Sequence, residues 1–309
     1  MVIIAGFMNR RKFIGLSAAA ASVAAVRGAG EEVKPVLTFG LITDAQYADV
    51  DPNGERHYRE SVPKLKAAVE SLSKQKLPFT LHLGDFIDRD FAAFDVMLPL
   101  LVPLGHPVRH LLGNHDYTVS DGEKDKVRAK LGMPHDYYTF RESGVRFVLI
   151  DTNGVSVYKY PADSPQTRDA DTILKKLAAE GLNAAKKWNG GVPGSQIGWL
   201  EKELTAADAA KEPVILCGHH PLLPADGHQV WNSEGLLEVI DKHPAVIAYF
   251  CGHQHGGGEV VRNGIPYITF KSMLHEPGVN SWSVIHLFKD KLRIEGYGRE
   301  VPREIPLKA

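Results

Sequence analysis

The hydrophobic and polar positions along the chain repeat one arrangement, in which a short apolar run ends in a small, polar turn. Short apolar runs that are bounded by glycine and polar residues predict buried strands. Five of these runs end in carboxylate, amide or imidazole side chains: Asp44-Ala45-Gln46, Gly84-Asp85, Gly113-Asn114-His115, Gly218-His219-His220 and Gly252-His253-Gln254-His255. Because open α/β folds place their ligands at the carboxyl ends of strands, the pattern predicts one site assembled from distant parts of the chain.

The rest of the pattern mixes helical and strand periodicity. Helices are predicted over 55–75, over 91–101, within 167–187, and after Ser195 as an N-cap. Strands are predicted at 36–43, 79–83, 108–112, 214–217, 246–251, 260–261, 265–270, 283–288 and 292–297, with a hairpin of 137–140 and 146–150 that turns at Ser143-Gly144. The predicted fold is therefore α/β (α+β): a four-layer α-β-β-α sandwich of two packed mixed sheets with helices on the outside.

The first residues have the layout of a secretory signal. Arg10, Arg11 and Lys12 precede an Ala-rich apolar segment that is too short to span a bilayer comfortably, and small residues follow near Ala29. The arginine pair resembles a twin-arginine signal, which a receptor reads and which is not a stable membrane anchor. We expect residues 1–29 to be a signal, 30–309 to be one domain, and the protein to be exported to the periplasm or outside the cell. The alternative is a frayed amphipathic N-terminus.

The balance of charge argues against a nucleic acid partner, and the two cysteines are expected to be structural. The chain has 36 Lys and Arg against 37 Asp and Glu, and the predicted signal contains basic residues and no acidic ones. Binding to a nucleic acid polymer would need a concentrated positive surface, which this sequence lacks. Cys217 and Cys251 each end an apolar run and are expected to be small buried strand residues, although a disulfide between them stays possible. The sequence does not give the oligomeric state.

The strand ends supply a set of oxygen and nitrogen donors without any thiolate. Seven side chains in these turns are able to bind a metal ion: Asp44, Gln46, Asp85, Asn114, His219, His253 and His255. Seven donors are too many for one tetrahedral ion but suit two adjacent ions that share a ligand, and Asp85 is the natural bridge. Such donors suit Mn, Fe, Co or Zn. His82 and His110 lie inside strands and are expected to be core residues.

These five motifs resemble those of the calcineurin-like metallophosphoesterase superfamily, and more narrowly those of manganese-dependent ADP-ribose/CDP-alcohol diphosphatases. The narrower resemblance depends on Gln46, where most of the superfamily has histidine. It depends also on strings elsewhere in the chain: Arg56-His57-Tyr58-Arg59-Glu60-Ser61, Asp151-Thr152-Asn153, Asn189-Gly190-Gly191, Trp231-Asn232 and Gly298-Arg299-Glu300-Val301-Pro302-Arg303. The resemblance covers about residues 36–305 and implies two divalent ions, with manganese favoured.

The resemblance also implies a role for each site residue. One ion would be held by Asp44, Gln46, Asp85 and His255, and the other by Asp85, Asn114, His219 and His253. A hydroxide between the ions would attack phosphorus. His115 would stabilise developing charge or protonate the leaving oxygen, and Asp88 would fix the tautomer of His115. His220 is not a ligand in the family pattern.

The leading expectation is hydrolysis of the phosphoanhydride bond in a nucleoside diphosphate-linked compound such as ADP-ribose or a CDP-alcohol. Arg56 and Arg59 are candidates to hold the second phosphate, or else form a solvated helix face. Tyr47 and Trp231 are candidates to stack on a nucleobase, or else simply pack. The alternative function is a general or cyclic-nucleotide phosphodiesterase with the same metals. A binding module without catalysis is less favoured, because every metal position and His115 are present.

Overall fold

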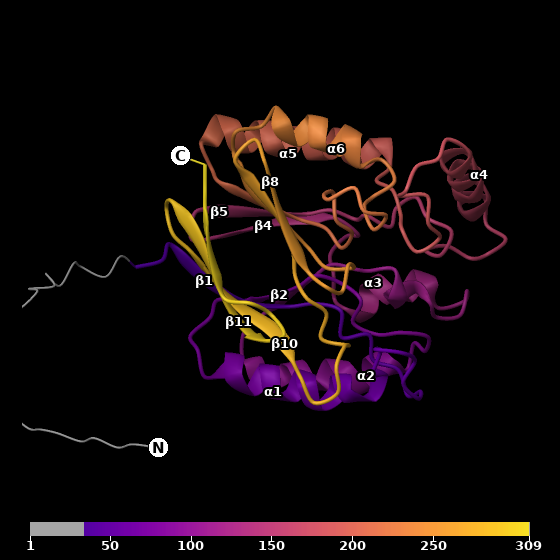
Figure 1. Cartoon of the computed structure of the whole chain (residues 1–309), viewed down its shortest axis with the longest axis horizontal. Helices are drawn as coiled ribbons and strands as arrows, with labels where there is room; N and C mark the ends of the chain where they lie inside the picture. Colours follow the sequence, from indigo (N-terminus) through magenta and orange to yellow (C-terminus); the bar gives the residue numbers. More distant parts are fainter. Residues whose placement is uncertain (1–33, 309) are drawn as a thin grey trace, which may run out of the picture. The chain divides into compact units, whose positions relative to one another are not determined.

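Two six-stranded sheets lie face to face, with helices on both outer sides (Figure 1). The computed structural model describes residues 34–308, which form one compact unit. The predicted signal lies outside these residues, so the signal and the export that it implies stay predictions. No helix within residues 34–308 is both long and apolar enough to cross a membrane.

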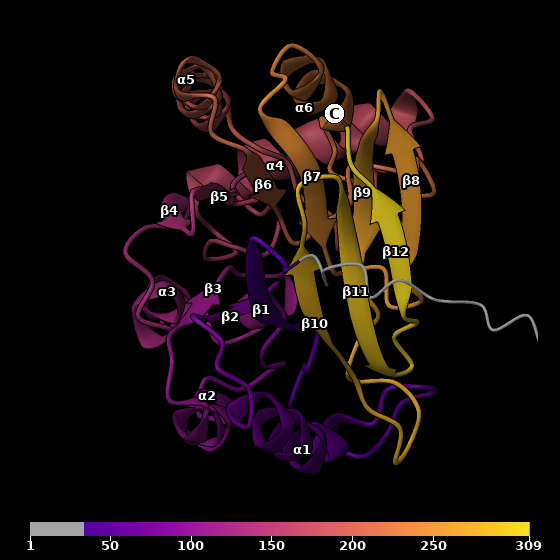
Figure 2. The same cartoon turned by 90° about the vertical axis from the view of Figure 1, so that its left-hand side faces the viewer.

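Each sheet mixes parallel and antiparallel strands, as predicted. The first has the order β12-β11-β10-β1-β2-β3, with bounds Arg303–Pro306, Lys291–Gly298, Ser281–Leu287, Leu37–Ile42, Thr80–His82 and Val108–His110. The second has the order β4-β5-β6-β7-β9-β8, with bounds Tyr138–Glu142, Val145–Leu149, Val214–Cys217, Val246–Cys251, Ile265–Thr269 and Gly258–Arg262. Figure 2 shows the two sheets with their strands side by side.

The outer layers are helical. Helices α1 (Ser61–Ser73) and α2 (Ala93–Met97) cover the first sheet, while α5 (Gly194–Ala210) and α6 (Ser233–Asp241) cover the second (Figure 1). The remaining helical segments lie in connections: α3 (Val127–Lys130), α4 (Pro165–Ala179), and the 3-10 turns Tyr58–Glu60, Leu98–Leu104, His115–Tyr117 and Lys124–Lys126. The four-layer sandwich is therefore confirmed.

Strand alternation divides the apolar side chains between two cores. In β5, Phe147 and Leu149 belong to the large core cluster that includes residues of both sheets, whereas Val148 belongs to the cluster that contains Leu200 of α5 and Leu236 of α6. Successive side chains on a strand point to opposite faces, so both faces of this sheet are covered. This explains why the predicted strands are continuous apolar runs.

Several predicted boundaries were wrong by a few residues. Helix α5 begins at Gly194 with Pro193 as its N-cap, so Ser195 lies inside the first turn and is not the cap. The helix predicted from residue 55 begins at Ser61, after a 3-10 turn. Pro193 itself is extended, with ψ of 150°, and its carbonyl oxygen accepts the backbone N–H groups of Gln196 and Ile197, so the helix starts directly after it. The hairpin turn at Ser143-Gly144 is confirmed by the pairing of β4 with β5.

The core predictions for histidine and cysteine are confirmed. His82 and His110 are buried, and their Nδ1 atoms lie 3.1 Å apart. Cys217 and Cys251 are buried free thiols.

Candidate metal centre

Seven strands pair in parallel in the two sheets, and the five that precede the predicted ligands, β1, β2, β3, β6 and β7, bring their carboxyl ends to one edge of the sandwich. Strands β1, β2 and β3 pair in parallel in the first sheet, and β5, β6, β7 and β9 do so in the second. The pairing continues past the strands, because the backbone N–H of Asp44 donates to the carbonyl oxygen of Gly84, and that of Gly252 donates to that of His219. The turns that hold the predicted ligands are thereby brought together.

Potential metal-ligand atoms form two groups that share one carboxylate. Asp85, His219 and His253 form one group, and Asp44, Asp85 and His255 form the other; within each group the ligand atoms all lie within 4.8 Å of one another. Asn114 adjoins the first group and Gln46 the second, as described below. We name them the His219 position (Asp85, Asn114, His219, His253) and the His255 position (Asp44, Gln46, Asp85, His255). All seven predicted ligands are thus brought together, with Asp85 common to both positions.

At the His219 position, lone pairs point at one another. Nδ1 of His219 donates to the carbonyl oxygen of Leu83 at 2.8 Å, and Nε2 of His253 donates to Oδ1 of Asn189 at 2.9 Å. The remaining ring nitrogens lie 3.3 Å and 3.0 Å from the same acceptor, Oδ1 of Asn114. Acceptors that face one another need a proton or a cation between them, so this donor set fits a bound metal ion.

The His255 position also has an unused acceptor. Nε2 of Gln46 donates to Oδ2 of Asp85 at 2.9 Å and lies 2.9 Å from Nε2 of His255. The amide oxygen of Gln46 is buried and has no partner. A buried amide oxygen without a partner is costly, and a cation at this position would satisfy it after the amide turns. Asp44 completes the group, with Oδ1 3.6 Å from Nε2 of His255.

Backbone strain is concentrated at these ligands. Asp44, Gln46, Asp85 and His253 all have φ between 45° and 67°, a region that side chains other than glycine seldom adopt. Strain of this kind persists where the surrounding structure enforces it, and it gathers at functional sites. The glycines of the motifs allow the close approach: a Cβ on Gly113 would collide with the carboxylate of Asp85.

Asp116, the residue directly after His115, holds the turn that carries Asp85. Its carboxylate accepts the backbone N–H groups of Gly113, Asp85, Phe86 and Ile87 at 2.8–3.2 Å. Four such donors fix the loop after β2 against the loop after β3.

In this cluster, the effect of burial on each pKa is opposed by a neighbouring group of opposite charge. Burial raises the pKa of Asp44 to about 6, although His219 opposes the shift. Burial alone would lower the pKa of His219, but Asp85 raises it to about 9. Burial would raise the pKa of Asp85, yet His219 holds that pKa well below its usual range. Asp85 and His219 therefore stabilise a proton between them, with Nε2 of His219 3.2 Å from Oδ2 of Asp85, and a bound cation would take the place of that proton.

His115 stands beside the two positions but does not join them. Its Nδ1 lies 3.2 Å from Oδ1 of Asp88, and its Nε2 lies 3.3 Å from Nη1 of Arg56. Asp88 is in turn held by the hydroxyl of Thr118, which donates to Oδ1 at 2.9 Å. Burial lowers the pKa of His115, but Asp85 and Asp88 outweigh it and raise that pKa above its usual value. Asp88 therefore lies beside the ring of His115, and the catalytic roles predicted for the two residues stay predictions.

His220 is excluded from the cluster by its own hydrogen bonds. Its Nδ1 lies 2.7 Å from the hydroxyl of Thr152, and its Nε2 donates to the carbonyl oxygen of Trp188 at 3.1 Å. Both ring nitrogens are therefore engaged away from the other ligands.

A cavity of about 570 Å³ opens beside the cluster. It is lined by Arg56, Asn114, His115, Trp188, His228, His253, Gln254, His255, Gly256 and His275. Trp188 and His228 were missed by the sequence reasoning. Trp188 is 48% exposed, whereas the other three tryptophans within residues 34–308 are buried or half-buried. Its place directly before the string Asn189-Gly190-Gly191 was the available signal.

Three predicted substrate contacts lie elsewhere. Trp231 is buried in a small hydrophobic cluster, and its Nε1 donates to the carbonyl oxygen of Lys186, so stacking on a substrate does not fit its placement. Arg59 is exposed and paired with Asp49 and Asp51. Tyr47 packs against the main core and does not line the cavity. Of the four predicted contacts, Arg56 alone lines the cavity.

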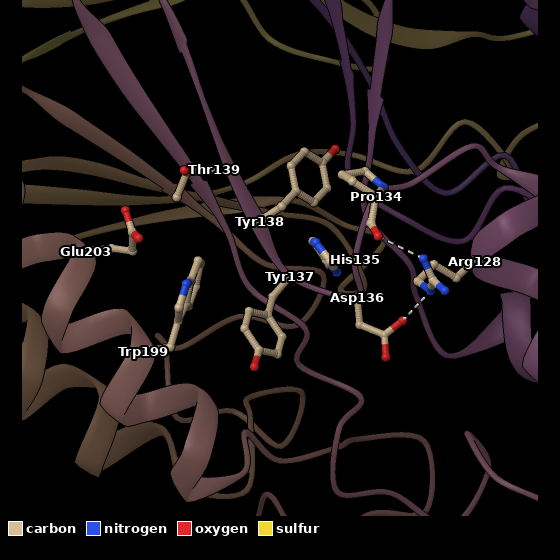
Figure 3. A pocket seen from close by; sticks show the side chains of 9 residues that line it. All are labelled: Arg128, Pro134, His135, Asp136, Tyr137, Tyr138, Thr139, Trp199 and Glu203. Carbon is tan, nitrogen blue, oxygen red and sulfur yellow. Dashed lines mark hydrogen bonds and ion pairs between the residues drawn. The ribbon is translucent and has the colours of Figure 1, made fainter.

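A second cavity, of about 720 Å³, lies apart from the metal cluster (Figure 3). It is lined by Arg128, Pro134, His135, Asp136, Tyr137, Tyr138, Thr139, Trp199 and Glu203. Arg128 donates to the carbonyl oxygens of Met133 and Pro134 and forms an ion pair with Asp136. The rings of Tyr137 and Trp199 pack together with centroids 4.7 Å apart. Neither of the two metal-ligand groups contributes to this cavity.

The profile of the calcineurin-like phosphoesterases matches residues 37–257. This is more than half of the chain's 309 residues. The chain therefore belongs to the calcineurin-like phosphoesterase family, as the motifs predicted, and it is a hydrolase that acts on phosphate ester or diphosphate bonds.

The relatives narrow this class. A manganese-dependent ADP-ribose/CDP-alcohol diphosphatase from Oryza sativa subsp. japonica is 31% identical over 307 residues, which cover 88% of this chain and 94% of that protein. The protein of the same name from Homo sapiens is 28% identical, over 87% of this chain and 92% of its own length. The crystal structure of a dimetal phosphatase from Danio rerio has a TM-score of 0.80 at 28% identity and covers 89% of this chain and all of that one.

Proposed function

We propose that the protein is a manganese-dependent diphosphatase that cleaves the phosphoanhydride bond of nucleoside diphosphate-linked compounds of the ADP-ribose or CDP-alcohol type. One observation carries the proposal: two ligand groups share Asp85 beside a cavity that also holds His115, Arg56 and Trp188. The names of the relatives agree with the metal and with the substrate class.

The donor set suits manganese. Carboxylate, amide and imidazole groups without thiolate are typical ligands of Mn²⁺. Gln46 contributes a neutral amide oxygen, which is a weaker ligand for Zn²⁺ than imidazole. Two divalent cations held here would supply a water molecule of lowered pKa and neutralise charge at phosphorus.

The chain's own residues handle the rest of the reaction. The attacking water loses a proton to solvent and its oxygen forms a bond to one phosphorus. The bond from that phosphorus to the bridging oxygen breaks, and the bridging oxygen takes up a proton. His115 is placed to give that proton from Nε2, because Asp88 lies against Nδ1 on the far side of the ring. Arg56, 3.3 Å from Nε2 of His115, is placed to bind the departing phosphate.

Trp188 is the candidate platform for a nucleobase. Its indole lines the cavity and is about half exposed, while its backbone is fixed by His220. Base–aromatic stacking tolerates different bases, which agrees with a substrate class that includes both adenine and cytosine compounds.

The alternative, a phosphodiesterase acting on cyclic nucleotides or general diesters, uses the same metal positions. A panel of ADP-ribose, CDP-choline, cyclic nucleotides and bis-p-nitrophenyl phosphate, assayed with Mn²⁺, separates the two. The proposal expects the highest kcat/KM for the two diphosphates. A higher kcat/KM for cyclic nucleotides or aryl diesters would overturn it in favour of the alternative.

The base platform has its own test. Trp188→Ala should lower kcat/KM for ADP-ribose by about 5- to 150-fold, since stacking contributes about 1–3 kcal/mol per base. Hydrolysis of a diphosphate ester without a nucleobase should change little. Trp199→Ala, a matched substitution in the cavity of Figure 3, should leave both unchanged. Equal losses on both substrates would show that Trp188 is structural.

A further inference from the structure

The segment Ser272–Glu276, which we name the support segment, is bonded to two ligands of the His255 position. The backbone N–H of Ser272 donates to the carbonyl oxygen of His255 at 3.3 Å, and that of Leu274 donates to the carbonyl oxygen of Asp44 at 3.1 Å. The hydroxyl of Ser272 also donates to the carbonyl oxygen of Asp44. The support segment therefore sets the distance between the backbones of Asp44 and His255.

A buried lysine fixes the support segment in turn. Nζ of Lys64, on α1, donates to the carbonyl oxygens of Met273, His275 and Glu276 at 2.7–3.0 Å. Three acceptors saturate an ammonium group, so Lys64 has no donor left for another role. Glu276, whose carbonyl oxygen is one of the three acceptors, has φ of 56°, a region that side chains other than glycine seldom adopt.

The side chain of His275 reaches the ring of His255. Nε2 of His275 lies 2.6 Å from Nδ1 of His255, and the ring planes are nearly perpendicular at 88°. Nε2 of His255 faces the cluster, where Gln46 and Asp44 lie. On its other side, Nδ1 of His275 lies 3.3 Å from Oε2 of Glu55.

These contacts allow one direction of hydrogen bonding if Nε2 of His255 is to bind a cation. That nitrogen then carries a lone pair, so Nδ1 of His255 carries the proton and donates it to Nε2 of His275. Nδ1 of His275 must then donate to Glu55, which is the acceptor that the structure provides. Partners of this kind fix the tautomer and the ring orientation of a metal ligand.

We propose that His275 is a positioning residue for the His255 position: by accepting the N–H of His255 it keeps the lone pair of Nε2 directed at the cation. This inference rests on the proposed two-metal site but not on the identity of the substrate. The histidines of the other position are held differently, by oxygen atoms of Leu83 and Asn189 that are only able to accept. Glu55 contributes little by itself, because its side chain is 84% exposed.

The test compares two replacements of similar length, one with a hydrogen-bond acceptor and one without. His275→Gln offers an amide oxygen to Nδ1 of His255, whereas His275→Met does not. The full chain, freed of metal, is titrated with Mn²⁺ by calorimetry without substrate. We expect two binding steps in the wild type. In His275→Met one step should weaken about 10- to 100-fold while the other is unchanged, and His275→Gln should restore most of the loss.

His286→Met is the matched control. His286 has nearly the same side-chain exposure as His275, at 13% against 15%, and it also contacts a glutamate, but it lies on β10 away from the cluster. It should bind Mn²⁺ as the wild type does. Thermal unfolding of each metal-free variant confirms that it folds.

The inference is overturned if His275→Met binds both ions as the wild type does, or if His275→Gln is as weak as His275→Met. A wild-type chain that binds a single ion overturns the inference together with the two-metal site. A chain that binds two ions with the expected pattern but hydrolyses no diphosphate fails the proposed function and leaves the role of His275 standing.

Discussion

The two cation positions share Asp85 but are built from different materials. The ligands of the His219 position are fully or almost fully buried, and oxygen atoms that are only able to accept hold its histidines. Each position has one neutral amide, Asn114 or Gln46, but the histidine of the His255 position is partly exposed and a second imidazole supports it. The two halves of the site therefore differ in burial and in the group that fixes the orientation of their histidines. We therefore expect the His219 position to bind Mn²⁺ more tightly than the His255 position does, and so to fill first in a titration.

The substitution expected to have the largest effect removes what the two positions share. Asp85→Asn keeps the shape of the side chain but removes the charge, so that both positions lose their common ligand. We expect Mn²⁺ binding to fall at both, and turnover to fall by about 10³-fold or more, since a catalytic metal supplies several kcal/mol. Calorimetry and kcat together measure this. Retention of one tight ion with wild-type affinity would mean that the positions do not share Asp85.

The next largest effect is a fall in kcat that leaves Mn²⁺ binding at both positions unchanged. His115→Ala should bind two Mn²⁺ ions as the wild type does, while kcat falls by about 10²- to 10⁴-fold, the usual contribution of a general acid. A substrate whose leaving group needs no proton should recover part of the rate. Wild-type turnover on a poor leaving group would remove His115 from the mechanism.

A smaller effect should distinguish Mn²⁺ binding at the His219 position from Mn²⁺ binding at the His255 position. Asn189→Ala removes the acceptor that holds Nε2 of His253, and it should weaken the first Mn²⁺ step about 10- to 100-fold while sparing the second. This is the converse of the pattern for His275→Met. Asn183→Ala, an exposed asparagine on the same connection, is the control. Equal weakening of both steps would contradict the division into two halves.

The smallest effect concerns the buried pair of His82 and His110. It is an effect on the free energy of unfolding and not on catalysis. Burial lowers the pKa of His110 to about 4 from 6.5. The unfolded chain therefore gains a proton as the pH falls below 6.5, whereas the folded chain does not until about pH 4. Stability is full above pH 6.5, and linkage gives a loss of about 2 kcal/mol at pH 5.

Chemical denaturation of the metal-free wild type and of His110→Gln at pH 7 and pH 5 checks this. The variant should lose about 2 kcal/mol less than the wild type between the two values. An identical loss in both proteins would show that His110 does not titrate with unfolding.

The sequence predicted the site better than it predicted what surrounds the site. Asp44, Asp85 and His219 follow apolar runs, and strand pairing forces the ends of such runs together, so local pattern was enough. Trp188 and His275 come from connections whose position depends on distant contacts, such as the clamp of Lys64 on the support segment. Trp231 looked like a candidate for stacking because exposure cannot be read from a loop sequence, and the structure buries it.

The most direct test of the account is anomalous diffraction from crystals of the full chain grown with Mn²⁺. The account predicts two manganese peaks about 3.5–4 Å apart, with the carboxylate of Asp85 between them, His219 and His253 on one side, and Gln46 and His255 on the other. A single peak, or two peaks that do not share Asp85, would contradict it.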